Sequence, residues 1–271
     1  MRVIPYVVGL TALSNTADTD TAIGGGAWDI PVWAKSIMSM GLAVQADLPT
    51  ATQAILCRSN LTSDNLPIQP FEAFAAPLSG ILGASGNGPS PGAVEKYDVN
   101  LRCNGGERLT GNIRPLTTNT TDYGSLMYVV SDAVPMEAQR HIKAGTLTTD
   151  TAVSSENPGT QYSISGARNI KQLLGVMAPA TVAGSEGMVH RIRFSSNEFA
   201  GVSNADLLMN SPQSGLATLQ SASIPGGVSR VDCNIPIQPV SQCNIQDYWY
   251  ALSSTTLATA TPWCSAVSYE V

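Results

Sequence analysis

The sequence predicts an all-β protein built of two tandem β-sandwiches, and three observations lead to this prediction. A segment of eleven residues recurs about half a chain later, apolar and polar residues alternate along many short stretches, and clusters of Gly, Pro, Asn and Ser separate these stretches. Alternation with a period of two is typical of a strand with one buried face. Many short strands with Gly- and Pro-rich turns indicate a sandwich or a barrel.

The repeat relates residues 91–101, PGAVEKYDVNL, to residues 225–235, PGGVSRVDCNI, at a shift of 134 residues. Four weaker pairs of segments follow the same order at shifts of 133 to 137 residues, among them residues 34–37 and 167–170. A period of this length is that of a whole domain rather than of a solenoid repeat. The shared order therefore indicates the duplication of one domain, with insertions and deletions in the loops.

The repeat also predicts the domain organisation. We expect a first domain at residues 1–133, a linker at 134–159 and a second domain at 160–271. Each copy has the length of an eight-stranded jelly roll, in which two sheets face each other. An immunoglobulin-like sandwich is the main rival, but the sequence lacks its Cys…Trp…Cys spacing.

The individual elements follow from the same patterns. Along residues 96–103, Tyr97, Val99 and Leu101 alternate with polar residues, which predicts a half-buried strand. The other expected strands are 36–45, 53–59, 108–114, 124–131, 169–177, 187–194, 230–237, 246–252 and 263–271. Short helices are expected in loops and in the linker, at residues 70–76, 135–144 and 203–209.

Composition excludes several classes of function. Charged residues make up 13% of the 271 residues, about half the usual share, and the net charge is −6 with no basic arm. Binding to nucleic acid needs clustered cations, so no direct sequence-specific binding to nucleic acid is expected. We identify neither a secretory leader nor a membrane span.

The sequence offers little chemistry for catalysis, so no enzyme activity, cofactor or metal is expected. The nucleophile-elbow, zinc-protease and phosphate-loop motifs are missing, and none of the five cysteines forms a CxxC pair. His190 is expected in the core, and His141 on the solvated face of the linker helix. Asp18 and Asp20 are expected to be solvated rather than to bind a cation.

The repeated blocks include Pro-Gly-x-Val at Pro91 and Pro225 and indicate two jelly rolls in tandem. This arrangement resembles the double jelly-roll major capsid proteins of tailless icosahedral viruses. That lineage includes adenovirus hexon and the coat protein of archaeal turreted icosahedral viruses. The resemblance implies a structural virion protein that forms pseudo-hexameric homotrimers in an icosahedral shell, assembled in the host cytoplasm. It implies as partners other copies of the chain and penton or minor capsid proteins, and it leaves open whether a lipid membrane lies beneath the shell.

Candidate site residues are few. Lys96 and Asp98, and their repeat equivalents Arg230 and Asp232, face outward and are expected to contact one another or a neighbouring subunit.

Asn60 and Asn119 begin N-glycosylation triplets and are candidates for that modification.

Two other functions remain open. A secreted or fibre-type β-sandwich adhesin would bind glycans through aromatic residues near the C-terminus: Tyr248, Trp249, Tyr250 and Trp263. We expect these aromatic residues more readily in a core or an interface. A β-sandwich hydrolase is disfavoured, because histidines and clustered acids are scarce.

Overall fold

The computed structural model describes residues 1–12, 16, 19–47, 57–62, 71–75, 93–115, 121–146, 148–150, 156–177, 189–199, 204–210, 229–238, 242–251 and 261–271. These residues form strands and connections, and none of them is helical. A helix able to cross a membrane is accordingly not found among them.

The first half of the chain forms two antiparallel sheets of four strands each. Their orders are β1-β8-β3-β6 and β2-β7-β4-β5, so the first strand of the half pairs with its last. This order is that of a jelly roll. The strands are β1 (Val3–Ala12), β2 (Thr21–Asp29), β3 (Ser36–Asp47), β4 (Cys57–Thr62), β5 (Phe71–Ala75), β6 (Ala93–Arg102), β7 (Arg108–Pro115) and β8 (Thr121–Ser131).

The second half repeats the arrangement, with two of its strands interrupted. β9 and β10 both pair with β18 and together take the place of β1, while β11 and β12 both pair with β17 and take the place of β2. The sheet orders are then β9/β10-β18-β13-β16 and β11/β12-β17-β14-β15. The bounds are β9 (Arg140–Ala144), β10 (Thr148–Asp150), β11 (Asn157–Pro158), β12 (Tyr162–Ser165), β13 (Asn169–Met177), β14 (Val189–Ser195), β15 (Asn204–Asn210), β16 (Ser229–Pro236), β17 (Gln242–Ala251) and β18 (Thr261–Glu270).

The two halves agree in detail as well as in strand order. The register of β3 shifts between Ile37 and Ser39, and the register of β13 shifts between Ile170 and Gln172, which is the same place in the repeat. The repeated segments at 91–101 and 225–235 lead into and form β6 and β16, which occupy the same position in their sheets. The predicted all-β class of two tandem jelly rolls is confirmed.

Aromatic stacking fills the space between the sheets of each sandwich. In the first half the ring of Trp28 on β2 stacks on that of Tyr128 on β8, with ring centroids 4.7 Å apart. In the second half Trp249 on β17 stacks on Trp263 on β18 at 5.1 Å, and both rings are fully buried. Because each pair joins opposing sheets, it contributes to the core of its own sandwich.

The three predicted short helices are wrong. Residues 70–76 contain β5, residues 203–209 contain most of β15, and the last five residues of the predicted linker helix, 135–144, are β9. β9 pairs with β18, more than a hundred residues away, and this distant partner outweighs the local helix propensity of the segment. The segment predicted as a linker thus also supplies β9, β10 and β11 to the second pair of sheets.

Candidate functional site

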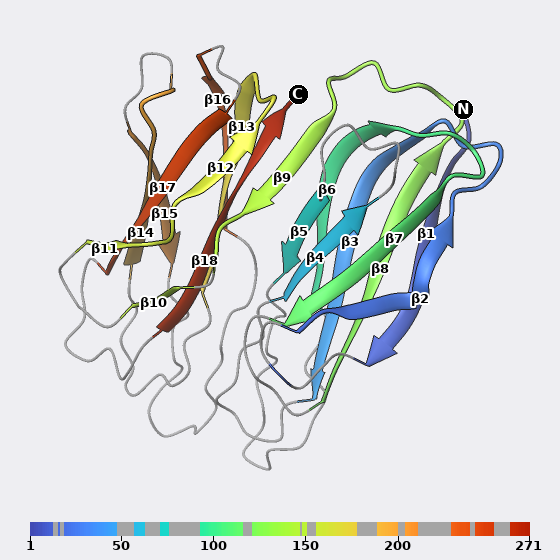
Figure 1. The fold of residues 1–271 in the computed structure, drawn as a ribbon, viewed down its shortest axis with the longest axis horizontal. Helices are drawn as coiled ribbons and strands as arrows, with labels where there is room; N and C mark the ends of the chain where they lie inside the picture. Colours follow the sequence, from blue (N-terminus) through green and yellow to red (C-terminus); the bar gives the residue numbers. More distant parts are fainter. Residues whose placement is uncertain are drawn as a thin grey trace.

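The two sandwiches lie side by side, and β9 of the second half lies at the boundary with the first (Figure 1). It packs beside β5 and β6. His141 on β9 lies opposite the core residue Tyr269, so the alternate residues Ile142 and Ala144 point away from that core. They are nevertheless only 1% and 3% exposed, because the first sandwich covers this face of β9.

Arg230 makes a second contact across the junction. Its guanidinium group donates a hydrogen bond to the backbone carbonyl of Lys96 at 3.0 Å and lies over the ring of Tyr97, 4.6 Å from the ring centroid. A cation above an aromatic face is attracted by the ring quadrupole. Arg230 on β16 therefore covers the β6 edge of the first sandwich.

The other predicted contact charges are arranged differently. Asp232 accepts a hydrogen bond from Gln172 Nε2 at 2.8 Å on the neighbouring strand β13. Lys96 and Asp98 are exposed, and neither forms an ion pair within the described part of the chain. Their contact with a neighbouring subunit stays a prediction.

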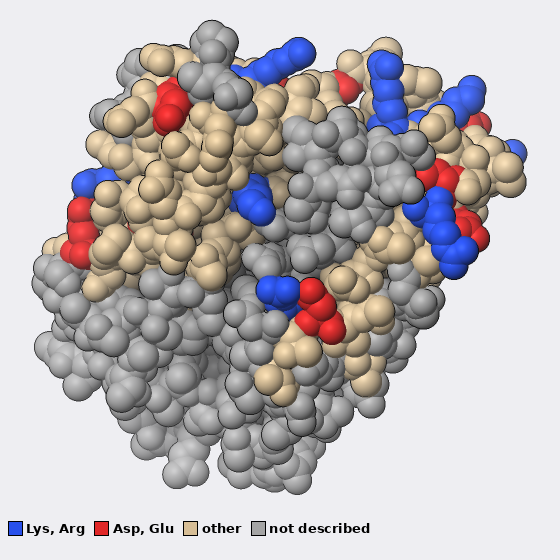
Figure 2. Space-filling view, in the orientation of Figure 1, with Lys and Arg blue, Asp and Glu red and all other residues tan. Residues whose placement is uncertain are grey.

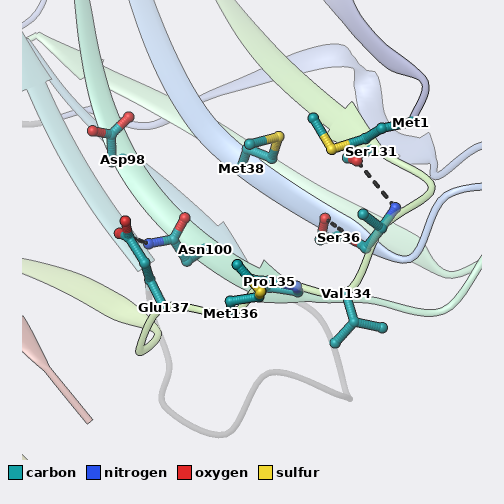
Figure 3. Close-up of a pocket in the computed structure, with 11 residues that line it drawn as sticks. Met1, Ser36, Met38, Asp98, Asn100, Ser131, Val134, Pro135, Met136 and Glu137 are labelled. Carbon is teal, nitrogen blue, oxygen red and sulfur yellow. Dashed lines mark hydrogen bonds between the residues drawn. The ribbon is translucent and has the colours of Figure 1, made fainter.

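A pocket of about 460 Å³ lies at the end of the first sandwich where the chain leaves β8 (Figure 3). It is lined by Met1, Ser36, Met38, Asp98, Asn100, Ser131, Ala133, Val134, Pro135, Met136 and Glu137. Asn100 has a positive φ of 49° and donates a hydrogen bond to Glu137 at 3.1 Å, which ties the start of the second half to β6.

The pocket contains no activated nucleophile among its lining residues. Ser36 donates its hydroxyl hydrogen to the carbonyl of Ala133 at 2.8 Å, and Ser131 Oγ accepts from the Ala133 backbone N–H at 3.1 Å. Both hydroxyl groups thus hold the outgoing chain rather than face a substrate. Neither histidine nor cysteine lines the pocket, and Glu137 accepts a hydrogen bond from Asn100.

The equivalent positions of the second sandwich carry a polar network. Lys171 Nζ lies 3.2 Å from Glu270 Oε1 and donates to Asn234 at 3.0 Å, and Asn169 donates to Glu270 at 3.0 Å. Burial raises the pKa of Glu270, but the hydrogen bonds and the Lys171 charge outweigh it and hold this pKa below its ordinary value. The two copies have therefore diverged at this end.

The buried tryptophans bear on the adhesin alternative. Trp249 and Trp263 belong to the core of the second sandwich, so neither ring can serve as a platform for a sugar at the surface. Tyr250 is partly exposed and lies under the guanidinium group of Arg191, at 5.4 Å. The predicted preference for a core role is confirmed for the two tryptophans.

Asp247 and His141 are buried ionisable residues of the second sandwich. Burial raises the pKa of Asp247 to about 6, although Ser265 donates a hydrogen bond to its carboxylate. Burial lowers the pKa of His141 to about 4. The predicted solvated position of His141 is wrong, because β9 is an inner strand of the molecule with both faces covered. The sequence pattern placed Asp247 in a predicted strand but did not indicate that its carboxylate is buried.

The remaining candidate residues, two aspartates and the cysteines, form no metal-binding cluster in the described part of the chain. Arg114 forms a bidentate pair with Asp20 at 2.9 and 2.8 Å, so this carboxylate is neutralised by a side chain, and Asp18 lies outside the described residues. Within the described residues, no group of His, Cys, Asp and Glu could hold a metal ion. Four of the cysteines, at 103, 233, 243 and 264, are free thiols.

The glycosylation candidates stay predictions. Asn60 is part of β4, where it lies opposite Glu72 and Asn112, and Asn119 lies outside the described residues.

Charge on the visible face is scattered. Lys, Arg, Asp and Glu lie singly or in small groups of opposite sign among uncharged residues, rather than in a basic patch (Figure 2). Among the described residues, Arg191 and Arg193 both pair with Glu156, each at 2.9 Å. Exposed pairs of this kind contribute little to stability.

Comparison with solved structures finds similar folds at low sequence identity. The chain is similar to the major capsid protein of STIV, Sulfolobus turreted icosahedral virus, with 9% identity, a TM-score of 0.47 and coverage of 100% of this chain and 97% of the other. It is also similar to PNGF-II, with 10% identity, a TM-score of 0.51 and coverage of 99% of this chain and 65% of the other. The second likeness supports the fold alone. No protein-family model and no curated protein matches the sequence.

Proposed function

We propose that this chain is the major coat protein of a tailless icosahedral virus and that it assembles through homotrimers. The observation that carries the proposal is the presence of two sandwiches with one strand order, packed side by side in one chain. Three such chains bring six similar sandwiches into one ring, which gives a threefold assembly a nearly hexagonal outline. A closed shell contains many positions with six neighbours, and a trimer with a nearly hexagonal outline fits these positions.

The surface composition supports a self-assembling role. Only 13% of the residues are charged, which lowers the cost of removing water where copies meet. The abundant Ser, Thr and Asn side chains can supply hydrogen bonds across such contacts. In this proposal the partners are other copies of the chain, penton or minor virion proteins and an underlying lipid layer, and the protein resides in the virion after assembly in the host cytoplasm.

The test is the association state of the purified chain. Light scattering after size exclusion should give a particle of three times 28.3 kDa, and negative-stain electron microscopy should show particles with six lobes. At higher concentration these particles should form sheets or shells without added ligand. A chain that stays monomeric at every concentration contradicts the proposal.

The competing functions that the sequence leaves open are a secreted or fibre-type β-sandwich adhesin that binds glycans and a β-sandwich hydrolase. Within the described residues, the pocket serines are occupied by Ala133 and the two core tryptophans are buried, so neither group offers a catalytic or sugar-binding surface. Incubation with an N-glycosylated peptide, followed by mass spectrometry, tests the hydrolase function directly. Release of the glycan would favour it over the coat role.

A further inference from the structure

The pocket of the first sandwich contains a methionine at a position where the second sandwich has a lysine. The register of β3 shifts at Met38, and that of β13 shifts at Lys171. These two residues therefore hold the same position of the repeat. The neighbouring strands agree, because the unpaired residues opposite Met38 include Asn100 and those opposite Lys171 include Asn234.

In the second sandwich the chain supplies its own cation at this position. Lys171 Nζ donates a hydrogen bond to Asn234 Oδ1 at 3.0 Å and lies 3.2 Å from Glu270 Oε1. The side chain of Lys171 is 23% exposed, so most of its aliphatic stem is covered. This position of the fold thus accommodates a lysine side chain, with amide and carboxylate oxygens around the ammonium group.

In the first sandwich an equivalent acceptor remains, but the pocket has no cationic side chain. Met38 stands in place of Lys171, and neither Lys nor Arg is among the residues that line the pocket. Asn100 donates through its amide nitrogen to Glu137, and its side-chain oxygen points away from Glu137 (Figure 3). This oxygen corresponds to the Asn234 oxygen that binds the lysine in the second sandwich.

Asp98 adds a negative charge beside this acceptor. Like Asn100, it lies on β6 and lines the pocket, and its carboxylate forms no ion pair within the described residues. Glu137 is already engaged, because it accepts a hydrogen bond from Asn100 and lies 3.8 Å from Arg140 Nη2. Asp98 is therefore the carboxylate of the pocket that is open to a cation.

The rest of the pocket suits the aliphatic part of a long side chain. Met38, Val134, Pro135 and Met136 give it an apolar lining, and its volume of about 460 Å³ is typical of a ligand pocket. Val134 is 50% exposed and Met136 is fully exposed, so apolar side chains also surround the opening. Exposed apolar residues around a few polar groups are typical of a binding site.

We propose that this pocket binds a lysine side chain of a partner protein, so that the partner supplies in the first sandwich the ammonium group that Lys171 supplies in the second. The aliphatic stem of the partner's lysine packs on the methionines, and the ammonium group contacts Asp98 and Asn100. Charge complementarity favours a lysine over an acidic or neutral side chain, because the open charge in the pocket is negative. This interaction is independent of the coat function.

Binding is tested with the peptide acetyl-Leu-Lys-Leu-amide, and the same peptide with an acetylated lysine is the uncharged match. NMR of the full chain, labelled at its methionine methyl groups, should show saturable shifts of the Met38 and Met136 signals with the charged peptide. The acetylated peptide should bind at least about 3-fold more weakly. The two signals are assigned with Met38→Leu and Met136→Leu. Equal binding of the two peptides, or no shift of either signal, overturns the proposal. The same shifts on concentrating the chain without peptide would assign the pocket to a second copy and would also overturn it.

Three variants locate the site. Asp98→Asn removes the open charge and should weaken binding of the charged peptide at least about 3-fold. Met38→Lys introduces the lysine of the second sandwich and should abolish binding. Asp232→Asn is the matched control and should bind as wild type, because Asp232 holds the position of Asp98 in the sandwich that has its own lysine. Both aspartates are exposed, so their variants should keep the wild-type thermal transition. Equal losses in Asp98→Asn and Asp232→Asn, or wild-type binding by a folded Met38→Lys chain, contradict the proposal.

Discussion

Replacement of Asp247 by Asn should change how stability depends on pH. Burial raises the pKa of Asp247 from 3.8 to about 6 in the folded state. Between these two pKa values the folded state holds a proton that the unfolded state releases, so this group stabilises the fold less and less as pH rises through the interval. At neutral pH the carboxylate is charged and buried, and the shift corresponds to a destabilisation of about 3 kcal/mol.

The assay is denaturant unfolding of wild type and Asp247→Asn at about pH 7.5 and about pH 4. The asparagine can still accept the hydrogen bond from Ser265 and carries no charge at either pH. The difference in unfolding free energy between variant and wild type should favour the variant by about 2 kcal/mol more at the higher pH than at the lower. Comparison of two pH values cancels any constant packing cost of the substitution.

Exposed Asp98 supplies the matched control, and Asp98→Asn should give a profile parallel to wild type. Parallel profiles for Asp247→Asn and wild type would refute the reasoning, because they would mean that Asp247 ionises alike in the folded and unfolded states.

The other predictions concern the junction and the two cores. His141→Asn should have the opposite effect on the pH profile: the pKa of His141 falls from 6.5 to about 4, so wild type loses stability as pH drops from about 6.5 towards 4, and the variant should lose less in the same unfolding assay. Trp263→Ala should lower the unfolding free energy by about 3–5 kcal/mol through the cavity it leaves, measured by urea denaturation, whereas an exposed sugar-platform residue would lower it far less. Arg230→Ala should cost about 1 kcal/mol through loss of its contacts with Lys96 and Tyr97, and an unchanged urea midpoint would contradict that contact. Gly105→Ala should destabilise the fold and lower the melting temperature, since the added Cβ would lie 2.0 Å from the carbonyl oxygen of Val32.

Local sequence pattern predicted several of the strands. The expected strand at 169–177 coincides with β13, and the expected strands at 108–114 and 124–131 lie within β7 and β8. Where buried and exposed residues alternate, as from Lys96 to Val99 on β6, the pattern predicts a strand because one face meets the core and the other does not. β9 fails this condition, since both of its faces are covered, and its residues were predicted as helix and its His141 as solvated.

By itself, the sequence determined that one β-sandwich is present twice, because five pairs of segments recur in the same order at shifts of 133 to 137 residues. Tertiary structure alone decided which copy of each surface is buried. Ala144 and Val7 occupy the same place in the repeat, yet only Ala144 is covered, because the neighbouring sandwich lies on one side of the pair and not on the other. Burial at such positions depends on contacts between distant strands, and periodicity within a strand carries no information about them.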